Sequence, residues 1–190
     1  MAASTSTLSA ILVLFVVAAI TGGSVAVGAS TALDEVCGGL GGYYVTTELC
    51  VSALCPDPSS SPPPPCRAAR DANAVAAIAA RLAAANATAA RDSVQAALSS
   101  YAGDATGKAA ALRSCLKLYG GVVPALQWAA RSVAAGRFRG AREMMQAAQY
   151  VPAGCDGMVD GGAALPSENE GFATMATVAH AVLATLSKGY

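Results

Sequence analysis

The stretch that decides the fold is LRSCLKLYGGVVPALQWAARSVAAGRFRGAREMMQAAQYVPAGC, residues 112–155. In its first half, apolar residues recur at the three- and four-residue spacing that lines one face of a helix. They are Leu112, Leu116, Tyr119, Val123, Leu126, Ala130 and Val133. After Gly136 a second helical segment begins at Phe138, and Pro152 is expected to end it. The stretch therefore predicts a helical hairpin whose apolar face other helices must cover.

Two cysteines bracket this hairpin. Cys115 lies near the start of the first helix and Cys155 just past the end of the second, so an antiparallel pair brings them together at one end. A bridge between them closes a loop of about 40 residues and would stabilise the fold by about 4 kcal/mol, because the unfolded chain loses entropy. We therefore expect a disulfide at this position.

Length and composition indicate one principal domain. The chain has 190 residues, and its 12 basic and 12 acidic residues cancel, so nothing in its charge indicates binding to nucleic acid. Long alanine-rich runs, residues 68–97 and 105–148, favour helices over a sheet. With three phenylalanines and one tryptophan, the core is expected to be packed by small side chains.

The N-terminus predicts the compartment. The apolar run LSAILVLFVVAAI, residues 8–20, is followed by TGGS and then by small residues. This pattern is typical of a signal peptide, and the run is too short for a membrane-spanning helix. No lysine or arginine precedes it, which departs from the usual pattern. We expect residues 1–28 to be a signal peptide cleaved near Gly28 or Ala29, and the protein to enter the oxidising secretory route.

Six cysteines follow the expected cleavage site, an even number that allows many connectivities. They are Cys37, Cys50, Cys55, Cys66, Cys115 and Cys155. The competing role, zinc binding, is disfavoured because no C-x-x-C pair occurs and His180 is the only histidine. The simplest hypothesis bridges each cysteine to its neighbour, with Cys37 joined to Cys50 and Cys55 to Cys66.

The remaining segments complete the fold prediction. Residues 29–66 are expected to form a small helical hairpin followed by a connector, where SSSPPPP at 59–65 favours polyproline II. Residues 67–101 read as one long helix, and a last helix is expected after the loop that follows Cys155, with Ser167 and Glu170 as a capping box. The predicted class is therefore all-α. An antiparallel, up-down-up-down four-helix bundle over residues 67–190 follows a disulfide-stabilised N-terminal hairpin.

No catalytic arrangement is visible. There is one histidine, the carboxylates are scattered, and no glycine-rich phosphate loop opens a helix. We therefore expect no catalytic residues, no cofactor and no metal, and we do not expect an enzyme. Asn86-Ala87-Thr88 is an N-glycosylation acceptor, which in a secreted protein would have to face solvent.

Over residues 29–190 the chain resembles the plant invertase and pectin methylesterase inhibitor family. The resemblance rests on the cysteines at 37, 50, 115 and 155, with the runs CVSAL from Cys50, CLKLY from Cys115 and CDGM from Cys155. It implies that one disulfide ties the N-terminal hairpin and another ties two bundle helices. Cys55 and Cys66 are additional to that four-cysteine pattern, and the step from Cys37 to Cys50 is longer than the commonest form.

The resemblance also implies a function. The protein is expected to be a secreted inhibitor in the apoplast or cell wall, with the vacuole as another possible location. Its target would be acid invertase, which is slightly preferred, or pectin methylesterase. Neither nucleic acid nor, after signal cleavage, a membrane is expected as a partner. The alternative is a non-inhibitory structural or signalling protein of the cell wall.

The inhibitory contact is expected at Gly136, Arg137 and Phe138. Family members that inhibit invertases carry Pro-Lys-Phe between the second and third bundle helices, where it enters the enzyme's active site. Here the charge and the aromatic ring are retained while the proline is lost. The run MQAAQ, residues 145–149, looks less like the Ser-Ala-Ala-Leu-Thr pattern common in pectin methylesterase inhibitors. The alternative reading of the turn is an exposed helix start with Phe138 in the core.

Overall fold

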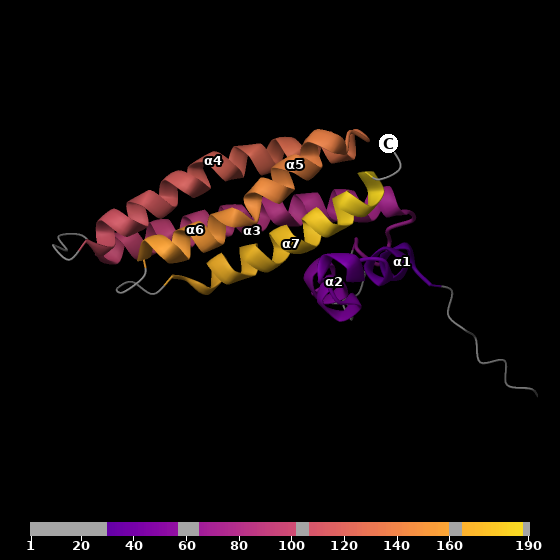
Figure 1. Ribbon diagram of the computed structural model, residues 1–190, viewed down its shortest axis with the longest axis horizontal. Helices are drawn as coiled ribbons and strands as arrows, with labels where there is room; N and C mark the ends of the chain where they lie inside the picture. Colours follow the sequence, from indigo (N-terminus) through magenta and orange to yellow (C-terminus); the bar gives the residue numbers. More distant parts are fainter. Residues whose placement is uncertain (1–29, 57–64, 102–106, 160–164, 188–190) are drawn as a thin grey trace, which may run out of the picture.

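Four helical rods lie side by side along the long axis of the molecule (Figure 1). The computed structural model describes residues 30–56, 65–101, 107–159 and 165–187. Within these ranges every regular element is a helix. The rods are α3 (Ala72–Ser100), α4 (Lys108–Ala134), the pair α5 (Arg139–Ala148) and α6 (Tyr150–Val159), and α7 (Ser167–Leu186). The structure is thus the predicted four-helix bundle.

A small hairpin precedes the bundle and lies against α3 and α7. It consists of α1 (Ala32–Gly38), the 3₁₀ turn η1 (Gly41–Tyr43) and α2 (Thr47–Leu54). Figure 1 shows it beside one end of the rods. The predicted signal peptide and most of the proline-rich connector lie outside the described residues.

Small side chains let the rods approach closely, as the composition predicts. Most of the buried face of α3 is alanine, and this helix packs against both α4 and α7. Large side chains fill the remaining space, among them Tyr119, Leu126, Met145 and Phe172, each fully buried. The Tyr119 and Phe172 rings are 5.7 Å apart between centroids.

Two predicted helix starts are corrected. The first long helix begins at Ala72 rather than at residue 67, because the Asp71 carboxylate accepts a 2.8 Å hydrogen bond from Ala74 N and so caps the helix there. The capping box expected at Ser167 is absent. Pro166 is the N-cap of α7 and Ser167 is already the first residue of the helix, so no side chain caps its start; the Ser167 hydroxyl donates instead to Glu168 Oε2 at 3.5 Å.

The third rod departs most from the prediction. Pro152 does not end it; the rod breaks at Gln149 and continues as α6, which contains Pro152, Cys155 and the residues after it. Proline cannot donate to the carbonyl of Ala148, four residues earlier, so the ladder of α5 stops there. The same proline is tolerated in the first turn of a new helix, where no N–H partner is needed. In α4 the helix is continuous through the exposed Pro124.

Three disulfides tie these elements, with the neighbour-to-neighbour pairing expected from the sequence. Cys37 and Cys50 join α1 to α2, with Cα atoms 5.5 Å apart. Cys55 and Cys66 close the connector, with Cα atoms 5.6 Å apart. Cys115 and Cys155 join α4 to α6, with Cα atoms 4.9 Å apart. No described cysteine is free.

Candidate functional site

The turn between α4 and α5 has a rigid backbone. Gly136 has a φ of 74°, the left-handed conformation that glycine adopts without steric cost. Gly136 N donates to Val133 O and Arg137 N donates to Ser132 O, both at 2.9 Å. This pair of bonds is the Schellman motif, which satisfies the last carbonyls of a helix. The chain direction on leaving α4 is therefore fixed.

The turn exposes one of its two large side chains and buries the other. Arg137 is exposed, whereas Phe138 is only 5% exposed and belongs to the core. A direct contact between the Phe138 ring and an enzyme, expected from the sequence, therefore does not fit this conformation. Instead the ring anchors the start of α5, and Phe138 O accepts a 2.8 Å hydrogen bond from Arg142 N. The alternative reading of Phe138 describes the structure better.

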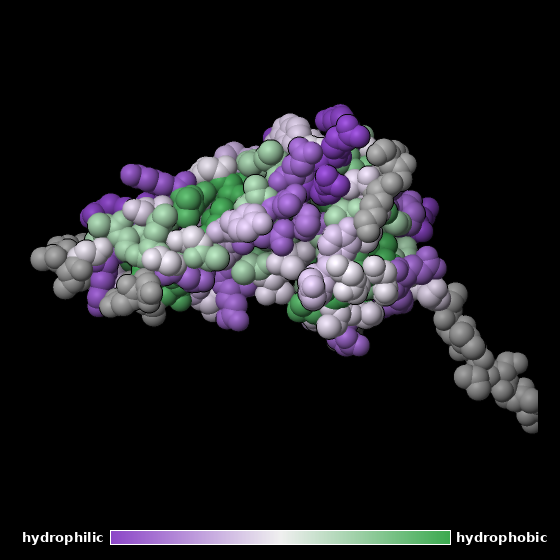
Figure 2. Space-filling model, in the orientation of Figure 1, coloured by the Kyte–Doolittle hydropathy of each residue, from purple (hydrophilic) through white to green (hydrophobic). Residues whose placement is uncertain are grey.

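A basic hollow lies directly beside the turn. We call it the arginine pocket; its volume is about 370 Å³, and it is lined by Arg137, Arg139 and Arg142, the backbone at Gly136 and Gly140, and Ser187 at the end of α7. Figure 2 shows strongly hydrophilic residues gathered over the start of α5. Within the described residues none of the three arginines forms an ion pair. The pocket therefore has a positive potential on a protein with no net charge.

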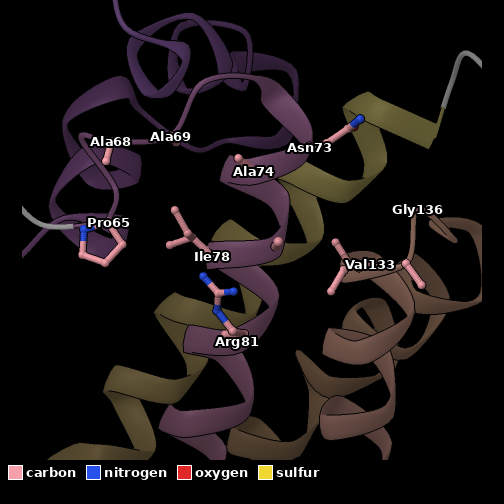
Figure 3. A pocket seen from close by; sticks show the side chains of 12 residues that line it. Pro65, Ala68, Ala69, Asn73, Ala74, Ile78, Arg81, Val133 and Gly136 are labelled. Atoms are coloured by element: carbon pink, nitrogen blue, oxygen red, sulfur yellow. The ribbon is translucent and has the colours of Figure 1, made fainter.

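A second hollow lies on the other side of Gly136. We call it the Arg81 groove; its volume is about 660 Å³, and its lining includes Ala69, Ala77, Ile78, Arg81 and Val133 as well as Gly136. Figure 3 shows Arg81 and Ile78 from α3 facing this space, with Val133 and Gly136 across it. The groove is mostly apolar, with one exposed arginine. The turn thus forms a ridge between two hollows.

Arg142 also affects the only histidine. His180 on α7 is half-buried and meets the Tyr43 ring edge-on, with centroids 6.0 Å apart. Burial, and then the nearby Arg142 charge, lower the pKa of His180 below its ordinary value of 6.5. Folding therefore shifts the His180 imidazole towards its neutral form.

A largely buried polar network joins the first turn of α7 to α4 and α6. The Tyr119 hydroxyl donates to Asn169 Oδ1 at 2.5 Å, and Asn169 Nδ2 donates to Asp156 Oδ1 at 3.0 Å and to Pro152 O at 3.4 Å. Burial, with the Asp156 carboxylate nearby, raises the pKa of Tyr119. Every member is partnered, so this network has a structural role in joining α4, α6 and α7.

The predicted glycosylation site does not face solvent freely. Asn86 is half-buried in the middle of α3, on the side that α7 approaches, with Oδ1 3.9 Å from the position a Cβ on Gly171 would occupy. Its amide nitrogen, the atom to which a glycan would be joined, donates to Leu82 O at 2.9 Å. The folded structure therefore disfavours a glycan at Asn86.

The described residues bring together no group of histidine, cysteine and acidic side chains that could hold a metal ion. None of the helices in the described ranges combines the length and hydropathy that a membrane-spanning helix requires. The α4–α5 turn instead presents an exposed arginine on a fixed backbone, with a basic pocket on one side and an apolar groove on the other. The fold is that of a disulfide-tied helical bundle.

Comparison with known families identifies the class more closely. The family model of the plant invertase/pectin methylesterase inhibitors matches residues 31–182. The chain therefore belongs to this family, whose members are inhibitors rather than enzymes and are typically secreted to the apoplast. No curated protein matches the chain in sequence.

Sequence reasoning missed the arginines beyond the turn. It singled out Arg137 but neither Arg139 nor Arg142, although four arginines fall between residues 131 and 142 without one acidic residue among them. This run of positive charge in the sequence could have indicated a basic surface near the turn. Ser187 could not be found in this way, because it reaches the pocket only when the end of α7 packs beside α5.

Proposed function

We propose that this protein is a secreted inhibitor that blocks an acid invertase by inserting the α4–α5 turn into the enzyme's active site. The observation that carries the proposal is the exposed Arg137 on a Schellman turn that Gly136 and the buried Phe138 hold in place. Pectin methylesterase is the second candidate target. It stays a candidate because the turn lacks the proline of the Pro-Lys-Phe motif that invertase inhibitors carry.

The chemistry of the proposed target suits an arginine. Glycosidases act through a pair of carboxylates that flank the scissile bond in a concave site. A guanidinium can meet a carboxylate with two parallel charge-assisted hydrogen bonds. Because the backbone of the turn is already fixed, little conformational entropy is lost when it binds. Arg137 would then occupy the place of the sugar, and Phe138 would contribute by anchoring the turn from within.

This mechanism predicts the direction of a pH effect. The bond to Arg137 requires an ionised carboxylate in the enzyme. The affinity should therefore fall as the pH drops through the pKa of that carboxylate, while Arg137 itself stays charged throughout. Inhibition constants measured at several pH values with the folded inhibitor check this. An affinity that rises steadily towards acid pH would contradict the proposed bond.

The direct test is Arg137→Ala, assayed against acid invertase and pectin methylesterase side by side. Loss of a central arginine anchor should weaken invertase inhibition by about 2 kcal/mol or more, roughly 30-fold. Arg113→Ala is the matched control, because Arg113 is also exposed but lies near the opposite end of α4. Melting curves exclude misfolding. Unchanged invertase inhibition would reject the active-site role, and loss against pectin methylesterase alone would identify the second target.

A further inference from the structure

We propose that the arginine pocket is a binding site for acidic sugars, specifically for an oligomer of uronic acids in which each unit carries a carboxylate. This would give the protein a second ligand in addition to its target enzyme. The site is built at the meeting point of the α4–α5 turn, the first turn of α5 and the end of α7.

The positive charge of the arginine pocket favours the binding of an anion. Among the described residues, its lining contains three arginines and no acidic side chain. Two ion pairs form among the described residues, Arg67 with Asp34 and Arg91 with Asp92, and both lie away from the pocket. Each guanidinium presents a planar fork of donors that matches a carboxylate in two bonds. A carboxylate placed here would replace water at groups that no acidic side chain of the described residues pairs with.

Two further sets of donors are left open. Arg142 Nε is buried and has no hydrogen-bond partner in the described structure. The same side chain reaches Ser187 Oγ only over a long 3.5 Å bond from Nη1. In addition, no side chain caps the start of α5, so the first N–H groups of this ten-residue helix lack that partner. An unsatisfied buried donor is costly, and an anion in the pocket would relieve that cost.

Size and continuity favour an oligomer over a small inorganic anion. A pocket of about 370 Å³ is much larger than a phosphate ion needs. Gly136 lines both the arginine pocket and the Arg81 groove, so the two hollows meet at the turn. No Cβ projects from Gly136, and the position it would occupy has open space around it. A chain of acidic sugars could therefore pass over Gly136 and place a second carboxylate near Arg81.

The choice of a sugar acid as the source of the carboxylate rests on the proposed secreted location. A pectin methylesterase converts methyl esters of a polysaccharide into free carboxylates, so the product of one proposed target has this chemistry. An acidic side chain of the enzyme is the competing occupant of the pocket. Binding measured in the absence of any enzyme separates the two.

The experiment is a calorimetric titration of the secreted protein with a trimer of galacturonic acid at low salt. The methyl-esterified trimer and inorganic phosphate serve as ligand controls. We expect the acid trimer to bind at least about tenfold more tightly than either control, and Arg139→Gln to weaken it by about tenfold. Because Arg139 is exposed, this variant should fold normally. Arg142→Gln should weaken binding similarly, and Arg113→Gln, far from the pocket, should leave binding unchanged.

Several results would overturn the proposal. They are no binding of the acid trimer, equal binding of phosphate or of the ester, and equal losses in Arg139→Gln and Arg113→Gln. Enzyme inhibition by Arg139→Gln and Arg137→Ala, measured without sugar, distinguishes this proposal from the proposed function. Sugar binding that is lost in Arg139→Gln while inhibition persists supports two roles. Inhibition without any sugar binding by the unaltered protein leaves the enzyme's carboxylate as the occupant.

Discussion

Asn169 joins three helices through one side chain. Its amide accepts from Tyr119 on α4 and donates to Asp156 and to Pro152 O on α6, while the residue itself is 3% exposed. Asn169→Ala would leave the Tyr119 hydroxyl and the Pro152 carbonyl buried without this partner. We expect the free energy of unfolding to fall by about 2–3 kcal/mol.

Tyr119→Phe is the milder companion of that variant. It removes a single hydroxyl, keeps the packing against Phe172 and should cost about 1–2 kcal/mol. Urea unfolding of the two variants and the unaltered protein measures both effects. A loss in Asn169→Ala that is no larger than in Tyr119→Phe would show that the network is not a joint between the helices.

His180 gives the stability a predictable pH dependence. Because its pKa is lowered in the folded protein, the unfolded chain binds more protons between the folded value and 6.5. The contribution of the neutral imidazole to stability is therefore complete above 6.5 and is lost as the pH falls through the folded pKa. His180→Gln, which keeps a polar side chain without this titration, should flatten that part of the curve. Parallel slopes for the two proteins between about pH 7 and pH 5 would contradict the assignment.

At the scale of the element, the α4–α5 turn depends on one glycine. Any other residue at Gly136 must adopt a φ of 74°, although nothing lies within 4 Å of the added Cβ. Gly136→Ala should therefore cost about 1 kcal/mol of stability through backbone strain alone. It should weaken inhibition as well, because Arg137 would no longer be held in one place.

Gly121→Ala is the matched control for this strain. Gly121 lies inside α4, is exposed and also has nothing within 4 Å of an added Cβ. Alanine in a helix interior should raise stability by about 0.5–1 kcal/mol and leave inhibition unchanged. Thermal unfolding and an inhibition assay on Gly136→Ala and Gly121→Ala test whether stability and inhibition depend on the Gly136 conformation. Equal shifts in the same direction would exclude the special role of the Gly136 conformation.

The three disulfides should differ in their value to the fold. Cys115 and Cys155 are separated by 40 residues, whereas Cys55 and Cys66 are separated by 11. On the chain-entropy estimate, the first bridge contributes about 4 kcal/mol and the second about 3. Cys115→Ser should therefore lose more than Cys55→Ser; each change leaves a buried thiol and a buried hydroxyl, so the difference comes from the longer loop. The melting temperatures of Cys115→Ser and Cys55→Ser measure the two contributions. If Cys115→Ser melted within a degree or two of the unaltered protein, the Cys115–Cys155 bridge would not have a central role in stability.

Over the whole molecule, the sequence was most informative where its signals were local. Helical periodicity predicted α4, and nearness along the chain predicted the Cys37–Cys50 and Cys55–Cys66 bridges. The Cys115–Cys155 bridge spans 40 residues and was predicted from the antiparallel arrangement of two helices that the periodicity had already indicated. Pro152 was misread because a proline that ends one helix can equally sit in the first turn of the next. The arginine pocket could not be predicted because Ser187, at the end of α7, lies 45 residues beyond Arg142 in the sequence. The burial of Phe138 could not be predicted because it depends on how the core packs around the start of α5. Contacts between residues that are distant in the sequence leave no repeating pattern from which they could be predicted.

The central claim is that Arg137 binds a carboxylate in the active site of an acid invertase, and a double-mutant cycle tests it most directly. Binding of the unaltered inhibitor and of Arg137→Ala would be measured by calorimetry against the unaltered enzyme and against an enzyme with one catalytic carboxylate changed to its amide. We expect each single change to weaken binding by roughly 30-fold, and the double change to add little further loss, which corresponds to a coupling of about 2 kcal/mol. The cycle would be repeated with the other catalytic carboxylate, and losses that simply add in both cycles would contradict the claim.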